Sequence, residues 1–306
     1  MPQSPSFQLP DKVRLVEVGP RDGLQNETQA LDIDSKLQLI ERLVAAGLKT
    51  IEAGSFVNPR WVPQMADSDE LFQALPTMTE VTFTALTPNL KGLERAIKAG
   101  VREVAVFAAA TESFSQKNIN CSIDESMERF RPVVEKSREH GIAVRGYISC
   151  VVACPYEGSV SPQAVQKIAS KLLSMGCYEI SLGDTIGAGT PRQIVTLLQE
   201  LGQTITMGRL AMHLHDTYGQ AIANTYAALQ AGVAAFDCSV AGLGGCPYAP
   251  GASGNVATED VVYLLNGLGI EHGVDLNRLI EAGRFISEKL DRDYRPKAGV
   301  AMMAGG

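Results

Sequence analysis

Residues 43–56 read LVAAGLKTIEAGSF, in which a helix-like stretch ends at a glycine and an apolar, β-rich run follows directly. The same unit returns at residues 96–110, 138–150, 173–184 and 229–242. Each glycine stands where a helix C-cap would stand. Each run after it is short and continuously apolar, which is typical of a strand covered on both faces. The repeat therefore predicts helices that alternate with parallel strands.

Extending this pattern along the chain gives eight candidate strands. Helical patterns lie between them, for example at residues 35–46, 124–140, 161–175 and 190–201. Right-handed crossovers between eight such units favour closure into a (β/α)8 TIM barrel. An open doubly wound sheet is the alternative, but no GxGxxG follows the first strand. The strands are expected to begin near Val13, Thr50, Val81, Val101, Ala143, Tyr178, Arg209 and Ala235.

The length of 306 residues would by itself suggest about two domains. No linker divides the chain, however, so we expect a single domain over residues 1–306. The barrel would span about residues 13–270, and a further helical pattern at 275–290 would form a C-terminal helical appendage within about 271–292. The remainder, up to residue 306, is expected to be a mobile tail.

Composition excludes several classes of protein. Hydrophobic residues make up 45% of the chain and charged residues 20%, which rules out a disordered or fibrous protein. The net charge is 27 − 34 = −7, which argues against a nucleic-acid partner. No apolar run reaches the roughly 18 residues that a membrane span needs, so we expect no membrane partner. Six cysteines without a secretion signal predict a reduced, cytoplasmic protein.

In a TIM barrel the chemistry lies at the carboxyl ends of the strands. His213 and His215 fall in the seventh strand, where residues i and i+2 point to the same side and two imidazoles can converge on a metal. Two ordinary histidines are the alternative. Asp22, after the first strand, lies near them once the barrel closes. A carboxylate, two imidazoles and a side-chain amide favour a divalent cation.

Three further polar residues follow or interrupt apolar strands. Arg21 is either one half of a surface ion pair or a fixed cation beside a developing oxyanion. Glu52 stands inside an apolar strand, so its carboxylate must be paired or hydrogen-bonded. Asp184 ends the sixth strand and could belong to the site or cap the next helix.

The loop after the eighth strand, LGGCPYAPGASGN, is rich in glycine and contains Cys246 and Asn255. It could cradle a phosphate with its backbone amides or form a lid over the site. Cys246 lies in this loop and not in a strand core, so it is the best candidate for a reactive thiol.

Several long stretches make the family resemblance specific. The chain resembles the 3-hydroxy-3-methylglutaryl-CoA lyases, metal-dependent (β/α)8 barrels, from about Val13 to Leu290. Related synthases that make homocitrate, isopropylmalate or citramalate share the metal site but not the GGCPYAPGASGN loop. The matching stretches are VEVGPRDGLQNE, SFVNPRWVPQM, LTPNLKG, KNINCSI, VRGYISC, CPYEG, SMGCYEISLGDTIGAGTP, HLHDTYGQAIANT and VAGLGGCPYAPGASGNVATEDVVY.

The resemblance implies a function and a site. The reaction would be the retro-aldol cleavage of (S)-3-hydroxy-3-methylglutaryl-CoA to acetoacetate and acetyl-CoA, as in leucine breakdown and ketone-body formation. A Claisen-type acyl-CoA condensing enzyme and a non-catalytic binding barrel are the alternatives. Mg²⁺ or Mn²⁺ would be the cofactor, and the family suggests a homodimer. The implied metal ligands are Asp22, His213, His215 and Asn255.

The same resemblance assigns catalytic roles. Arg21 would face the enolate or carbonyl oxygen, and Cys246 would be the catalytic thiol. Glu52 and Asp184 would orient the substrate, the metal waters and the base, and either His213 or Asp184 could be that base. Lys117 and Asn118 could contact the CoA part of the acyl-CoA substrate, or they could be ordinary polar loop residues.

Overall fold

A computed structural model describes residues 9–245 and 254–305, and its centre is a closed barrel of eight parallel strands. Around the barrel the order is β1-β10-β9-β8-β5-β4-β3-β2. The (β/α)8 prediction is confirmed, and each strand begins within two residues of its expected position. The strands are β1 (Arg14–Glu17), β2 (Thr50–Ser55), β3 (Thr82–Leu86), β4 (Glu103–Ala109), β5 (Ala143–Ser149), β8 (Glu179–Asp184), β9 (Leu210–Leu214) and β10 (Ala235–Cys238).

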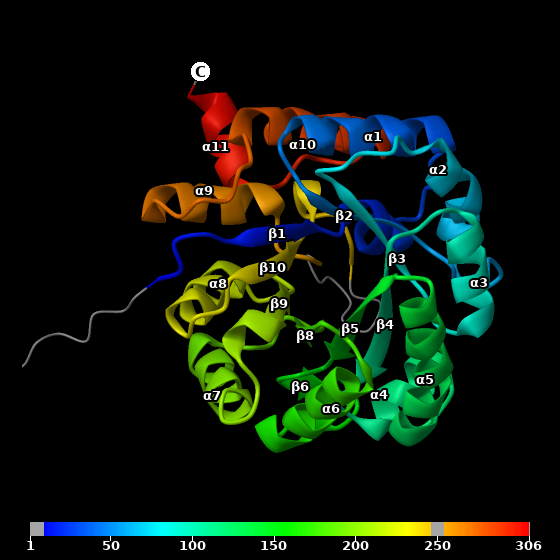
Figure 1. Cartoon of the computed structure of the whole chain (residues 1–306). Coiled ribbons are helices and arrows are strands. Elements are labelled where there is room, and N and C mark those ends of the chain that lie inside the picture. Colours follow the sequence, from blue (N-terminus) through cyan, green and yellow to red (C-terminus); the bar gives the residue numbers. More distant parts are fainter. Residues whose placement is uncertain (1–8, 246–253, 306) are drawn as a thin grey trace, which may run out of the picture.

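The helices surround the barrel (Figure 1). Several of the predicted N-termini are confirmed: Ser161 and Thr190 each precede a proline and cap the helix that follows. A capping box of Ser122 and Glu125 starts the helix expected near residue 124. The helices between strands are α1 (Ile33–Ala45), α2 (Ser68–Ala74), α3 (Leu90–Lys98), α4 (Glu112–Ile119), α5 (Ile123–Glu139), α6 (Pro162–Met175), α7 (Pro191–Leu201) and α8 (Ala221–Gln230).

Three helices follow β10: α9 (Thr258–Leu268), α10 (Leu276–Lys289) and α11 (Lys297–Ala304). The appendage predicted at 275–290 is α10, which packs along α1 across the top of Figure 1. A helix, α11, forms within the segment expected to be a mobile tail. Asp260 of α9 accepts hydrogen bonds from the backbone amides of Lys297 and Ala298 at the start of α11. None of the described helices is long and apolar enough to cross a bilayer.

Two further features of the chain were not predicted. A short antiparallel hairpin, β6 (Ala153–Cys154) and β7 (Gly158–Ser159), follows β5. A register shift between Glu52 and Gly54 bends β2 against β3. At this point α2 approaches β2 closely: a Cβ at Gly54 would lie 2.8 Å from the Ser68 hydroxyl, so the position requires glycine. The bend lies next to Glu52, whose side chain belongs to the site described below.

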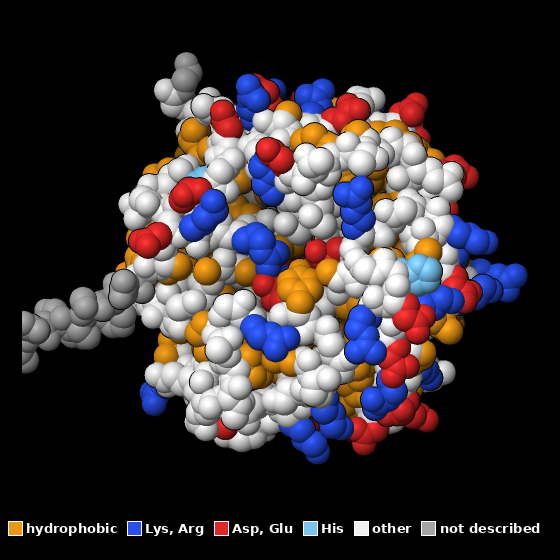
Figure 2. All heavy atoms as spheres, in the orientation of Figure 1, with side chains coloured by type: hydrophobic (Ala, Val, Ile, Leu, Met, Phe, Trp, Pro, Cys, Tyr) orange, Lys and Arg blue, Asp and Glu red, His pale blue; other side chains and the backbone are white. Residues whose placement is uncertain are grey.

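In Figure 1 the strands from β1 to β5 follow one another clockwise. With right-handed crossovers, this order means that the viewer faces the amino ends of the strands. Figure 2 shows the same face: acidic and basic side chains are interspersed around it and also meet in the hollow over the barrel. The carboxyl ends, where a barrel carries its chemistry, lie on the opposite face.

Candidate active site

The first part of the site is the turn that follows β1. Residues Gly19–Gly23 form a single π-helical turn, η1, and Arg21 and Asp22 lie within it. The turn is anchored to the end of β1, because the Glu17 carboxylate accepts a hydrogen bond of 2.8 Å from the Gly19 amide. A Cβ at Gly19 would lie 2.6 Å from that carboxylate oxygen, so the close approach requires glycine. The sequence Gly-Pro-Arg-Asp-Gly thereby places a cation and an anion side by side.

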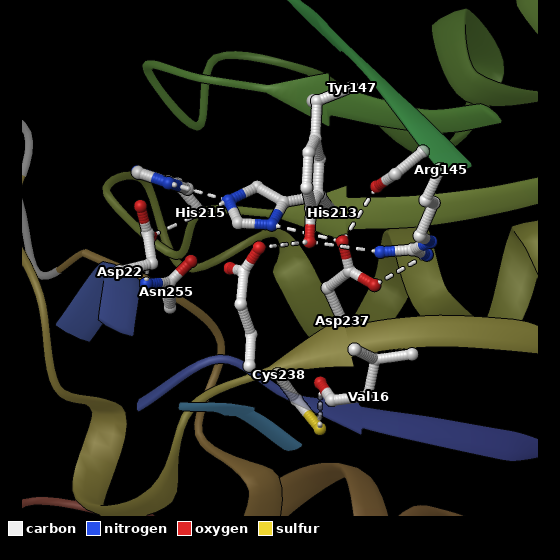
Figure 3. Close-up of polar contacts among 12 residues, drawn as sticks. Val16, Asp22, Arg145, Tyr147, His213, His215, Asp237, Cys238 and Asn255 are labelled. Carbon is white, nitrogen blue, oxygen red and sulfur yellow. Dashed lines mark hydrogen bonds and ion pairs between the residues drawn. The ribbon is translucent and has the colours of Figure 1, made fainter. Parts of the chain in front are cut away.

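Asp22, His213 and His215 converge on one point, and one ligand atom from each lies within 4.8 Å of the others. The two Nε2 atoms of the histidines are 3.2 Å apart, and His213 Nε2 is 3.9 Å from Asp22 Oδ2 (Figure 3). Asn255 pairs with His215 in a single β-bridge. Its Nδ2 donates to Asp22 Oδ2 at 2.7 Å. The four residues predicted as metal ligands are therefore brought together.

The spacing of the two imidazoles fits a shared cation. Bonds of about 2.1 Å to one octahedral ion place neighbouring ligand atoms about 3.0 Å apart. The observed separation of 3.2 Å is close to that value. Two unprotonated ring nitrogens this close would repel each other unless a cation or a proton lay between them. Oxygen and imidazole donors together suit a hard or borderline divalent ion.

Arg21 and Glu52 form a buried ion pair beside this cluster. Arg21 Nε lies 2.5 Å from Glu52 Oε2, and Arg21 Nη1 lies 2.7 Å from Asp22 Oδ1. Burial opposes the charge on Arg21, but the carboxylates of Glu52 and Asp22 outweigh it and raise the pKa of the guanidinium. Burial likewise opposes the charge on Asp22, yet Arg21 and the two histidines lower its pKa to about 2. The interpretation of Arg21 as a surface ion pair is wrong.

Asp184 ends β8 with its side chain fully buried. Its Oδ2 accepts a hydrogen bond of 2.9 Å from the Gly189 amide in the loop before α7, whereas the N-cap of α7 is Thr190. The helix-capping alternative is therefore wrong. Burial raises the pKa of Asp184 to about 6, against the opposing effect of the Gly189 and Ala188 amides. Its Oδ1 has no hydrogen-bond partner among the described residues.

Three residues near the site were missed by the sequence analysis: Arg145, Tyr147 and Asp237. The Tyr147 hydroxyl lies 3.4 Å from Glu52 Oε1, and its ring stands edge-on to His213. Arg145 and Asp237 are charged residues inside the apolar runs AVRGYIS and AFDCSVAG. A charged side chain inside an apolar strand must be paired or hydrogen-bonded, as was argued for Glu52. The same pattern could therefore have identified Arg145 and Asp237 from the sequence.

The remaining predicted residues are Lys117, Asn118 and Cys246. Lys117 and Asn118 are exposed on the last turn of α4, where the prediction expected a loop. The helix ends at Asn120, which has a left-handed backbone with φ of 48°. Cys246 lies outside the described residues. The five described cysteines are buried, and none forms a disulfide.

Comparison with known proteins places this geometry in a family. The HMGL-like family profile matches residues 12–286. A Pseudomonas aeruginosa protein named 3-hydroxy-3-isohexenylglutaryl-CoA/hydroxy-methylglutaryl-CoA lyase is 58% identical, over 97% of this chain and 99% of its own.

Two solved structures are also closely similar. A hydroxymethylglutaryl-CoA lyase from Pseudomonas aeruginosa has a TM-score of 0.96 and 58% identity, covering 97% of this chain and 99% of its own. An HMG-CoA lyase from Acinetobacter baumannii, solved with coenzyme A and 3-methylmalate, has a TM-score of 0.91 and 34% identity. That match covers 95% of each chain.

Proposed function

The chain belongs to the HMGL-like family, and from this premise we propose which of its residues carry out the reaction. It is a carbon–carbon lyase that cleaves 3-hydroxy-3-methylglutaryl-CoA to acetoacetate and acetyl-CoA. The assignment of residues rests on one observation: Asp22, His213 and His215 converge beside the buried Arg21–Glu52 pair.

Members of this family depend on a divalent metal, and we propose Mg²⁺ or Mn²⁺ as the ion. Asp22, His213 and His215 would hold it, because one ligand atom of each already lies within 4.8 Å of the others. Asn255, whose Nδ2 donates to Asp22 Oδ2, would supply its side-chain oxygen as the fourth ligand. Such an ion acts as a Lewis acid that lowers the pKa of a bound hydroxyl and so eases its deprotonation. The Nδ2 of Asn255 donates hydrogen bonds both to Asp22 Oδ2 and to the backbone oxygen of Leu243. These bonds fix the Asp22 carboxylate beside the start of the glycine-rich loop.

Asp184 is our candidate for the base that takes the proton of the tertiary hydroxyl. Its pKa near 6 leaves it mainly ionised at neutral pH while retaining appreciable basicity. Its Oδ1 lacks a hydrogen-bond partner among the described residues, so one oxygen remains for a proton. His213 is the second candidate, but its Nε2 faces the proposed metal position, and a ligand nitrogen is a poor base.

Once the hydroxyl loses its proton, the carbon–carbon bond breaks and its electron pair passes to the acetyl-CoA fragment. The Arg21 guanidinium, held by Glu52 and Asp22, would stabilise the negative charge on the enolate oxygen. Glu52 is fully buried and sets the orientation of the guanidinium. Cys246, which lies outside the described residues, would deliver the proton to the carbanion; a thiol with a reference pKa near 8.5 suits that role.

The substrate is an acyl-CoA, and we propose Lys117 and Asn118 as contacts for its CoA part, since both are exposed on α4, directly after β4. A homodimer and a cytoplasmic location also remain proposals. Size-exclusion chromatography with light scattering tests the first, and cell fractionation tests the second.

Incubation with 3-hydroxy-3-methylglutaryl-CoA and Mg²⁺ tests the proposed reaction directly. Formation of acetoacetate and acetyl-CoA in equal amounts is expected. Net condensation of acetyl-CoA with a 2-oxo acid would instead identify the Claisen-type alternative, and binding without turnover would identify the binding barrel. One relative is named for a 3-isohexenyl substrate as well, so kcat/KM should be compared for the 3-methyl and the 3-isohexenyl forms of the 3-hydroxyglutaryl-CoA substrate.

A further inference from the structure

Beneath the proposed metal ligands lies a buried carboxylate, Asp237, to which the reaction above gives no role. It projects from β10 and is 2% exposed. Its Oδ2 lies 3.3 Å from His213 Nδ1, at the outer edge of hydrogen-bond range (Figure 3). The Ser181 hydroxyl donates to the same oxygen at 2.6 Å. Asp237 therefore faces the side of the His213 ring opposite to the metal cluster.

Arg145 holds the other oxygen of this carboxylate. Its Nη2 lies 2.8 Å from Asp237 Oδ1, and its Nε donates to Glu179 Oε1 at 2.7 Å. Its Nη1 donates to the Tyr147 hydroxyl at 3.0 Å. All three groups on the guanidinium are thus engaged, so Asp237 cannot rotate away from His213 without breaking a buried ion pair.

His215 differs from His213 in this respect. Both Nδ1 atoms are buried and make no hydrogen bond of standard geometry with the described residues, but the Nδ1 of His213 lies 3.3 Å from Asp237 Oδ2, whereas the Nδ1 of His215 has no carboxylate paired with it there. Of the two imidazoles that converge on the metal position, only that of His213 has a carboxylate of the described residues beside its second ring nitrogen. A metal-bound histidine generally donates its second ring N–H to such a group, which fixes the tautomer and the ring orientation.

We propose that Asp237 is a positioning residue: it keeps the proton of His213 on Nδ1, so that Nε2 presents its lone pair to the cation. Ser181 and Arg145 hold the carboxylate for this task. The inference rests on the metal site proposed above. Its competitor is a purely structural role, in which Asp237 only neutralises the buried charge of Arg145.

The substitution Asp237→Asn separates these two roles. Arg145 has only donor groups, so the amide oxygen of Asn must face it. The NH₂ group then lies where Oδ2 was and points at His213 Nδ1. That geometry forces the proton of His213 onto Nε2, where it points at the cation. Glu179→Gln is the matched control, because it removes a different carboxylate from Arg145 without touching His213.

The decisive measurement is ¹⁵N NMR of the full chain labelled at histidine, with and without Mg²⁺. The chain has only four histidines, and His213→Gln identifies the signal of interest. In the unsubstituted protein we expect neutral His213 with its proton on Nδ1 and its Nε2 unprotonated. A neutral ring with its proton on Nε2 and none on Nδ1 would overturn the proposal, and this result needs no variant of Asp237 to fold.

Mn²⁺ titration followed by electron paramagnetic resonance provides the second readout. Asp237→Asn should weaken Mn²⁺ binding by about 10- to 100-fold and move the His213 proton to Nε2. Glu179→Gln should lower thermal stability while changing Mn²⁺ affinity by less than about threefold. Equal Mn²⁺ affinity in both variants would refute the positioning role. Failure of the unsubstituted protein to bind Mn²⁺ would instead refute the proposed metal site, whereas a wrong tautomer in a protein that binds Mn²⁺ refutes this inference alone.

Discussion

The substitution Arg21→Lys tests the central electrostatic argument because it keeps the charge and removes the planar fork. Arg21 places Nε and Nη2 on Glu52 and Nη1 on Asp22, all within 2.7 Å. A lysine ammonium on a flexible stem cannot reproduce both contacts in one geometry. We expect kcat to fall about 100- to 1,000-fold, which corresponds to about 2.7–4 kcal/mol of transition-state stabilisation. The lost charge-assisted hydrogen bonds should cost about 1.5–3 kcal/mol each in stability.

Acetoacetate formation, coupled to NADH oxidation by a dehydrogenase, measures kcat, and Mn²⁺ titration measures the metal site separately. Arg95→Lys is the matched control, since Arg95 forms an ion pair with Asp69 on helices away from the site. The control should retain the kcat of the unsubstituted protein. If Arg21→Lys also stays within twofold of that kcat, the guanidinium geometry does not stabilise the transition state and the reasoning is refuted.

Three other predictions follow from the site and its surroundings. Cys246→Ala should lower kcat far more than Mn²⁺ affinity, and an unchanged kcat rejects its role as proton donor. His215→Ala should weaken Mn²⁺ binding measured by calorimetry, and treatment with a chelator should abolish activity until the ion is restored; persistence of activity after chelation would contradict the metal requirement. Burial raises the pKa of Glu17 to about 7 and of Glu259 to about 8. Both carboxyls therefore bind protons more tightly when folded, so stability should fall as pH rises from about 4.5 through 8. Glu259→Gln should flatten that slope in thermal melts, and a stability that rises over this interval would show that other groups dominate.

Much of the fold was predictable because each local signal agreed with the others. A glycine after a helix and an apolar run after the glycine recur in the sequence, so strand positions such as Thr50 and Ala143 were found to within a residue. Helix α11 was missed because its sequence, KAGVAMMA, has two small residues near its start and no N-capping side chain. Its start is instead bonded to Asp260, a contact distant in sequence.

The site was predictable where neighbours in the chain are also neighbours in space. His213 lies in β9 and His215 directly follows its last residue, and Arg21 adjoins Asp22, so their spacing was informative. The pairing of Asp237 with His213 was not predictable from spacing, because it depends on the register between β9 and β10. The burial of Glu52 was expected, but its pairing with Arg21 was not predictable from the sequence, since that pairing depends on the fold of the turn after β1.

The barrel closes where β1 pairs with β10, and this seam has a consequence for the order of events in the cell. Asp22 leaves the ribosome early, whereas His213, His215 and Asn255 emerge about 190 to 230 residues later. A nascent chain therefore cannot assemble the complete set of proposed ligands until synthesis has passed residue 255. A cation that binds only the closed form stabilises it by mass action. Metal binding would then follow the synthesis and closure of the barrel. When the metal is scarce in the cell, the complete chain would lack this stabilisation and would be more exposed to chaperones and proteases.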